Sequence, residues 1–153
     1  MKMKNRNPVT VFLLSIVTLG IYDIYWLVQT KKVLNKETKF HTPTIWLLFA
    51  PAVLLIPGYV GLFINISKQT SDAYYASSSS APLPHPALFF VSFITIFLGF
   101  LSAFFISAFW FFKFSKAVNE YTRGKMSTAV TFLILWLIHL IGVALVQDAF
   151  NDD

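Results

Sequence analysis

Three polar side chains interrupt the long apolar stretches of the chain, and they are its best candidates for chemistry. They are Asp23, His139 and Gln147. A carboxylate at the centre of a membrane costs ~2.5–3.5 kcal/mol on insertion scales, so a residue such as Asp23 needs a compensating partner or a function. Asp23 fits a proton-titrating or cation-binding group. It equally fits an interfacial residue that reaches water, because Trp26 follows one helical turn later.

His139 lies near the middle of the last apolar stretch. Two roles are open for its imidazole: a proton relay with Asp23, or a neutral hydrogen bond that bridges two helices. Gln147 lies two helical turns beyond His139 on the same face. Together with Asp23 they form the candidate intramembrane polar site.

Motifs for other chemistry are missing from the sequence. It has no cysteine, no glycine-rich phosphate loop and no HExxH zinc motif, and its three histidines are widely scattered. No pair of carboxylates lies within a plausible catalytic segment. We therefore expect a non-enzymatic protein with no catalytic residue, no bound metal and no cofactor.

The composition is typical of a membrane protein. Hydrophobic residues make up 56% of the 153 residues and charged residues only 12%, against about a quarter in typical soluble domains. Apolar segments of at least 18 residues are transmembrane signals, since ~20 helical residues cross a ~30 Å hydrocarbon core. The sequence predicts an all-α, polytopic protein with four hydrophobic helices in the lipid bilayer. They cover residues 9–30, 44–66, 87–114 and 127–150.

The first segment has a weak point near its middle. Gly20 follows Thr18 and Leu19 there, and glycine destabilises a helix interior. Residues 9–30 are therefore either one kinked span or two half-helices that form a re-entrant hairpin. Residues 67–86 are polar and rich in serine and proline, which predicts an exposed linker.

A short block of sequence occurs twice. Residues 26–38 (WLVQTKKVLNKET) and 110–122 (WFFKFSKAVNEYT) align at an offset of 84 residues. Each block follows one apolar segment and precedes another. We therefore predict two tandem helical hairpins in one membrane domain, a parallel repeat of residues 9–66 and 87–151 about an axis along the membrane normal.

Each block carries three polar residues spaced three apart at the water end of its helix. A pseudo-symmetric docking surface is one interpretation, and an ordinary solvated helix end is the other. Small residues four apart in the third segment form a further stripe, which suits close helix packing in lipid. The docking stripes are Lys32, Asn35, Thr38, Lys116, Asn119 and Thr122, and the packing stripe is Thr95, Gly99, Ala103 and Ser107.

The net charge of +5 does not indicate nucleic acid, because the cations flank apolar segments. With four spans, eight cations lie on the side of the repeated blocks and four on the other side. With a re-entrant first segment the count is eleven against one. The positive-inside rule places the blocks in the cytoplasm in both cases. We then expect the linker and the C-terminus outside the cell membrane.

Residues 6–35 (RNPVTVFLLSIVTLGIYDIYWLVQTKKVLN) resemble the prokaryotic membrane family known as domain of unknown function 4234. Residues 113–127 (KFSKAVNEYTRGKMS) and the closing Val146-Gln147-Asp148 with Asn151 are also similar to it. The resemblance covers most of the chain apart from the linker, and it brings no activity, cofactor or catalytic residue. Its signature residues here are Arg6, Pro8, Thr18, Leu19, Gly20, Ile21, Tyr22, Tyr25, Trp26 and Asn35.

Two functions are compatible with these features. The favoured hypothesis is a non-enzymatic scaffold or accessory subunit whose cytoplasmic helix ends dock a protein partner or lipid headgroups. The alternative is a small homo-oligomeric transporter or channel, coupled to protons or cations through Asp23. That alternative is an analogy with small four-helix exporters that carry a carboxylate in their first helix. A membrane enzyme ranks last, for want of a nucleophile or metal set.

Overall fold

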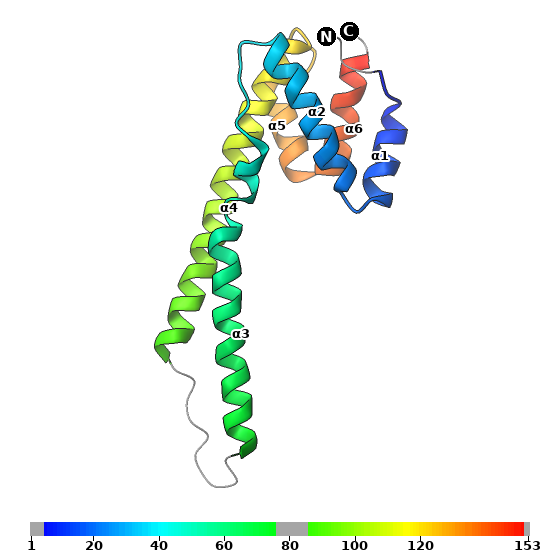
Figure 1. Cartoon of the computed structure of the whole chain (residues 1–153). Helices are drawn as coiled ribbons and strands as arrows, with labels where there is room; N and C mark the ends of the chain where they lie inside the picture. Colours follow the sequence, from blue (N-terminus) through cyan, green and yellow to red (C-terminus); the bar gives the residue numbers. More distant parts are fainter. Residues whose placement is uncertain (1–4, 76–85, 152–153) are drawn as a thin grey trace. The chain divides into compact units, whose positions relative to one another are not determined.

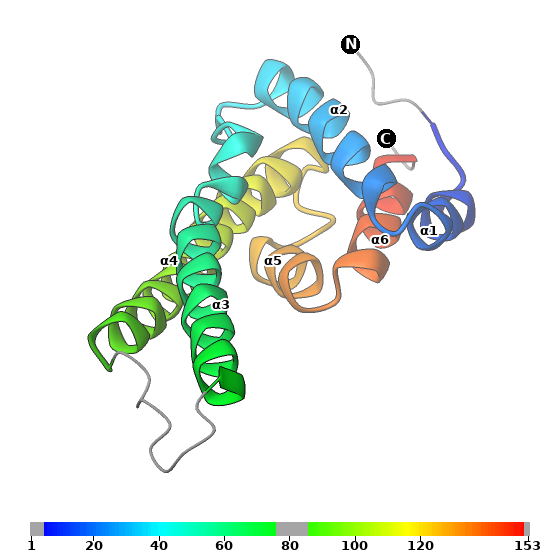
Figure 2. The same cartoon turned by 60° about the horizontal axis from the view of Figure 1, so that its bottom comes forward.

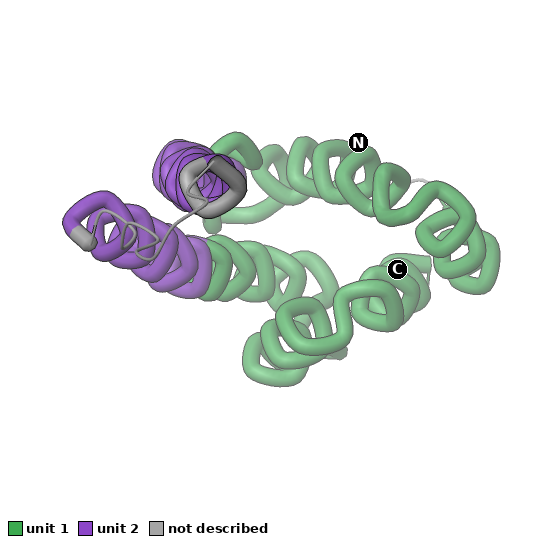
Figure 3. Tube along the Cα trace, turned by 90° about the horizontal axis from the view of Figure 1, so that it is seen from below, with its two compact units in different colours: residues 1–47, 107–153 green, residues 48–106 purple. Residues whose placement is uncertain are grey.

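The computed structural model describes residues 5–75 and 86–151, and every regular element in these ranges is a helix. The predicted all-α class is therefore confirmed (Figure 1). The chain forms two compact units, residues 1–47 with 107–153 and residues 48–106 (Figure 3). In chain order the elements are α1 (Pro8–Val17), α2 (Ile21–Glu37), the 3₁₀ helix η1 (Ile45–Phe49), α3 (Ala52–Tyr75), α4 (Pro86–Tyr121), α5 (Thr128–Leu137) and α6 (His139–Asn151).

The first apolar segment consists of two helices, which is the half-helix arrangement and not a single span. Leu19 and Gly20 have φ values of 50° and 87°, so the chain reverses between α1 and α2. Thr18 holds the turn, because its hydroxyl donates to the Leu14 carbonyl (2.7 Å) and accepts from the Tyr22 N–H (3.0 Å). The left-handed conformation explains why glycine stands at this position.

The fourth segment differs from the prediction of one span over residues 127–150. The helix breaks at Ile138 (φ −130°, ψ 59°), and α6 folds back along α5 (Figure 2). Gly142 lets the two backbones approach, since a Cβ atom there would lie 2.7 Å from the Ile134 carbonyl oxygen. The broken turn leaves the Leu135 carbonyl without its helical donor, and Nδ1 of His139 lies 3.2 Å from that oxygen.

This fold-back also determines where the end of α6 lies within the unit. A spanning fourth helix would carry the C-terminus away from the second repeated block. Instead, Phe150 near the end of α6 packs edge-to-face on Tyr121 at the end of α4, with ring centroids 5.2 Å apart. The end of α6 therefore lies at the same end of this unit as the second block.

The second segment and the linker have different bounds from those predicted. The segment expected at 44–66 begins as η1 and continues as α3 to Tyr75, so residues 67–75 of the expected linker are helical. The remaining linker residues 76–85 lie outside the described residues. The third segment and the second block form one continuous helix, α4, as expected.

Within the second unit, small residues allow α3 and α4 to pack closely. A Cβ atom on Gly99 would lie 2.7 Å from Leu55, and one on Gly58 would lie 3.1 Å from the Ile96 nitrogen. Among the other stripe residues, Thr95 and Ala103 are half-buried. Ser107 belongs to the other unit, where its hydroxyl accepts from Nε1 of Trp136 (3.3 Å).

Two helical stretches are long and apolar enough to cross a membrane. They cover Ile45–Ser71 and Ala87–Tyr121, and only 11% of the most apolar 18-residue window of each is buried. The other apolar helices, α1 and α5, are too short to span. The first unit instead has a conventional core in which Trp26, Leu34, Trp110, Phe114 and Val118 are at most 1% exposed.

Candidate functional site

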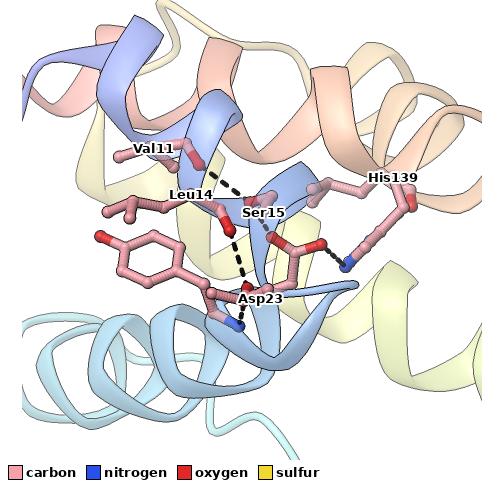
Figure 4. A network of polar contacts seen from close by, with 8 residues as sticks. Val11, Leu14, Ser15, Asp23 and His139 are labelled. Atoms are coloured by element: carbon pink, nitrogen blue, oxygen red, sulfur yellow. Dashed lines mark hydrogen bonds and ion pairs between the residues drawn. The ribbon is translucent and has the colours of Figure 1, made fainter.

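Asp23 lies where three helices meet. It is in the first turn of α2 and is 3% exposed. Its Oδ1 accepts from the Ser15 hydroxyl of α1, and its Oδ2 lies 3.8 Å from Nε2 of His139 at the start of α6 (Figure 4). The second separation is within ion-pair range and longer than a hydrogen bond. The structure thus brings Asp23 and His139 together, as the proton-relay interpretation of His139 requires.

The imidazole of His139 lies between two acceptors. Nδ1 is 3.2 Å from the Leu135 carbonyl, and Nε2 faces the Asp23 carboxylate. At these distances Nδ1 can donate to the carbonyl, whereas Nε2 faces the carboxylate at ion-pair range without a direct hydrogen bond. The His139 side chain is 33% exposed, so this end of the pair reaches the molecular surface.

A surface pocket adjoins the Asp23 pair on the side of the α1–α2 turn. Its volume is about 350 Å³, and most of its lining is apolar. The pocket is lined by Ser15, Ile16, Leu19, Gly20 and Leu140. Ser15 thus lines this pocket and also donates a hydrogen bond to the buried carboxylate of Asp23.

The structure does not place Gln147 with Asp23. Its amide oxygen accepts from Nε1 of Trp26 (2.9 Å), and its amide nitrogen donates to Oδ1 of Asn151 (3.0 Å). The side chain of Asn151 exchanges two hydrogen bonds with the backbone of Arg6 (3.2 and 2.7 Å). The Arg6 guanidinium then donates to the Tyr22 hydroxyl (3.0 Å).

This second polar network ties the residues before α1 to α2 and α6. Arg6 and Asn151 were not predicted as site residues, although both belong to the sequence pattern that carries the family resemblance. That pattern was the one signal that pointed to them. Their pairing spans most of the chain, so no local spacing indicates it.

The two repeated blocks make matching local contacts. Asn35 binds Thr42, accepting from its N–H and its hydroxyl (both 2.8 Å), and Asn119 donates to the Met126 carbonyl (2.7 Å). Each partner follows its asparagine by seven residues. Thr38 and Thr122 each donate to the carbonyl four residues earlier, those of Leu34 and Val118. These four stripe residues therefore hold the loops after the helices, and a docking role for them stays a prediction.

The two lysines of the stripes have different surroundings. Lys32 is exposed on α2. Lys116 is half-buried, with its ammonium 4.8 Å from the Phe112 ring centroid and 5.8 Å from that of Phe40. Contacts of this kind hold a lysine ammonium beside aromatic rings. Among the described residues, no group of three or more histidine or acidic side chains could hold a metal ion.

These features define an all-helical protein with two candidate membrane helices and a buried carboxylate that faces a half-buried imidazole. The family described as Domain of unknown function (DUF4234) matches residues 6–120, well over half of the chain, and the protein belongs to this family. The matched range includes Arg6, Ser15 and Asp23, and it ends before α5 and α6. No curated protein and no solved structure matches the chain.

Proposed function

We propose that this protein is a non-enzymatic scaffold or accessory subunit of the cell membrane. The observation that carries the proposal is the exposure of α3 and α4, whose most apolar windows are only 11% buried. Soluble monomers rarely expose contiguous apolar patches larger than a few hundred Å². A lipid bilayer covers such a surface without cost, so in this proposal both helices span it.

The charges support an orientation for this arrangement. In this proposal neither outer segment spans the membrane, so the N-terminus, the C-terminus and the repeated blocks share one side. That side holds eleven of the twelve lysines and arginines, and Lys68 alone lies near the other end of α3. The positive-inside rule makes the cation-rich side cytoplasmic. The C-terminus is then cytoplasmic, and residues 76–85 are outside.

In this proposal the cytoplasmic surface docks an acidic partner protein or the headgroups of the membrane. Its cations are exposed at Lys32, Lys36 and Lys39 beside the first block and at Arg123 and Lys125 beside the second. The matching contacts of the two blocks support the interpretation of a duplicated docking unit. A cation near a lipid surface contributes about 1 kcal/mol to binding.

The test is purification of the tagged protein from native membranes in mild detergent. We expect a stoichiometric second protein, retained in the Lys68→Glu control and lost when Lys32 and Arg123 are both replaced by Glu. A preparation that contains only this chain, or a partner whose binding is unaffected by the double substitution, contradicts docking of a protein at the cationic surface.

A second function, proton- or cation-coupled transport, is favoured by one specific observation. Asp23 is buried, its Oδ2 lies 3.8 Å from Nε2 of His139, and its partner Ser15 lines a surface pocket. In liposomes, Asp23→Asn should abolish pH-driven uptake of a cation, whereas Asp72→Asn on α3 should leave it unchanged. Equal transport by both variants would exclude this function and leave the scaffold proposal standing.

A further inference from the structure

Two turns with exposed apolar side chains lie at one end of the first unit. One is the turn between α1 and α2, and the other is the break between α5 and α6 (Figure 1). The two turns adjoin, because Leu19 of the first and Leu140 of the second line the same pocket. Five large apolar residues at these turns are between 52% and 92% exposed, and together they form the apolar tip: Val17, Leu19, Ile21, Leu137 and Ile138.

The charges of this unit lie away from the apolar tip. Apart from Asp23, residues 7–30 and 126–147 contain no lysine, arginine, aspartate or glutamate. Asp23 itself is only 3% exposed. Exposed cations lie beyond these ranges, at Lys32, Lys36, Lys39, Arg123 and Lys125. The surface therefore changes from apolar to cationic along the direction of the helices.

The apolar part of the unit has the depth of one membrane leaflet. The helices α1 and α5 have 10 residues each, and Lys31, the first cation of α2, follows Ile21 by 31 − 21 = 10 residues. Ten helical residues extend ~15 Å, which is half of a ~30 Å hydrocarbon core. With the apolar tip at the middle of a bilayer, the cations of α2 would therefore lie at the level of the headgroups.

The backbone of the α1–α2 turn satisfies its own hydrogen-bond donors. Every N–H group from Thr18 to Ile24 donates to an oxygen atom of residues 14–20, at 2.9 to 3.3 Å. A turn exposed to water needs no such internal partners, whereas in hydrocarbon each unsatisfied group costs several kcal/mol. At the second turn the Ile138 N–H donates to the Ile134 carbonyl (3.0 Å). The backbone of the first turn thus suits lipid as its surroundings.

We propose that the apolar tip inserts into the hydrocarbon of the leaflet on the side of the repeated blocks, as two adjoining re-entrant hairpins. The surface of the tip is then covered by lipid acyl chains. A protein partner would require neither the ~15 Å spacing between tip and cations nor the internally bonded turn. His139, whose side chain is 33% exposed beside the tip, can enter hydrocarbon as the neutral imidazole. The inference rests on the proposed membrane location and extends it from α3 and α4 to the first unit.

The experiment is electron paramagnetic resonance of the full-length protein in liposomes of phosphatidylethanolamine and phosphatidylglycerol. One nitroxide is attached to a single introduced cysteine, and its collisions with oxygen, which concentrates in hydrocarbon, and with a water-soluble nickel chelate are measured. The labels at Val17→Cys and Leu137→Cys should have a high oxygen-to-nickel collision ratio, equal to that of Phe97→Cys on the exposed surface of α4. The matched control Lys36→Cys, at the cationic end of α2, should have a low ratio. Because Val17 and Leu137 are both exposed, their replacement removes few contacts.

The outcomes separate the apolar tip from the membrane proposal. Tip labels that collide with nickel as often as the Lys36→Cys label lie in water and overturn the inference. Tip labels shielded from both oxygen and nickel are covered by protein, either a second copy or another chain, and overturn it as well. In both cases a high ratio at Phe97→Cys leaves the membrane proposal standing, whereas a low ratio there refutes the membrane proposal itself.

Discussion

Buried polar residues in the first unit are paired across helices, and the pairs determine how its helices meet. Asp23 faces Ser15 and His139, and Trp26 donates to Gln147. A polar group that leaves water without a partner costs several kcal/mol in an apolar medium. Each pair therefore favours one arrangement of α1, α2 and α6 over arrangements that leave these groups unpaired.

Replacing Gln147 with Leu tests the pair with Trp26. Both side chains are 1% exposed, so the indole N–H loses its acceptor and gains no water. We expect a loss of about 1–3 kcal/mol in the free energy of unfolding. Thermal unfolding in detergent measures it, with Gln69→Leu on exposed α3 as the matched control. Equal unfolding temperatures for the two variants would show that the Trp26 bond is dispensable.

The two block asparagines should differ in importance. Asn35 makes three contacts with Thr42, which is 4% exposed, whereas Asn119 donates one hydrogen bond to Met126. Asn35→Ala leaves a buried N–H and hydroxyl of Thr42 without an acceptor, so we expect it to cost about 2–3 kcal/mol, whereas Asn119→Ala should cost about 1 kcal/mol. Chemical denaturation of both variants checks the order, and the reverse order would contradict the contacts.

The sequence predicted the Asp23–His139 candidate because these are the ionisable side chains in the interior of apolar segments. Ser15 carried no comparable signal, since a lone serine in an apolar helix is common. Gln147 was grouped with Asp23 from its helical face alone. The position of Trp26, which decides its partner, depends on how α6 folds back, and helical spacing contains no information on that.

At the scale of elements, the two helix breaks differ in how clearly the sequence indicates them. Gly20 marks the first, because glycine readily adopts the left-handed conformation of that turn. Ile138 marks the second, and neither glycine nor proline stands there or beside it. That break depends on tertiary contacts: Gly142 against the α5 backbone, and the His139 ring near the freed Leu135 carbonyl. The uninterrupted apolar pattern of residues 127–150 therefore predicted one helix where two form.

Substitutions at Gly20 and Gly142 distinguish two reasons for glycine: a left-handed backbone conformation at Gly20 and close helix packing at Gly142. A Cβ atom added at Gly20 would meet nothing within 4 Å, so Gly20→Ala should cost about 1–2 kcal/mol through its positive φ alone. Gly20→Asn should recover part of this loss, because asparagine tolerates that conformation. Gly142→Ala should cost about 1–3 kcal/mol by forcing α5 and α6 apart.

The measurement is thermal unfolding of the three variants, with a second substitution at Gly142 as the control. Gly142→Asn should be worse than Gly142→Ala, since a larger side chain meets the same backbone. Rescue by asparagine at Gly142 would mean that conformation, and not contact with Ile134, requires the glycine.

At the scale of the whole molecule, the fold changes the number of segments that can span. Hydropathy indicated four segments, but α1 and α5 are each 10 residues long, and a 10-residue helix extends ~15 Å, half of a ~30 Å core. In the proposed arrangement the two folded-back segments do not span, so two spans remain and both termini share the side of the repeated blocks. A four-span chain would instead have its termini on the side opposite the repeated blocks. Charge bias favours the two-span arrangement, because it leaves one cation on the far side in place of four.

Because the natural chain contains no cysteine, single-cysteine labelling can test this topology without background. With a membrane-impermeant maleimide on intact cells, Ser78→Cys in the linker should label. Asn5→Cys, Arg123→Cys and Asp153→Cys should label only after permeabilisation, because the proposed topology puts both termini on the cytoplasmic side with the second block. If Asp153→Cys labels in intact cells while Arg123→Cys does not, α6 crosses the membrane and the fold-back at Ile138 is wrong. If Asn5→Cys also labels in intact cells, the result supports four spans with both termini outside. The Arg6–Asn151 contact is compatible with that arrangement, because the two residues would still share one side.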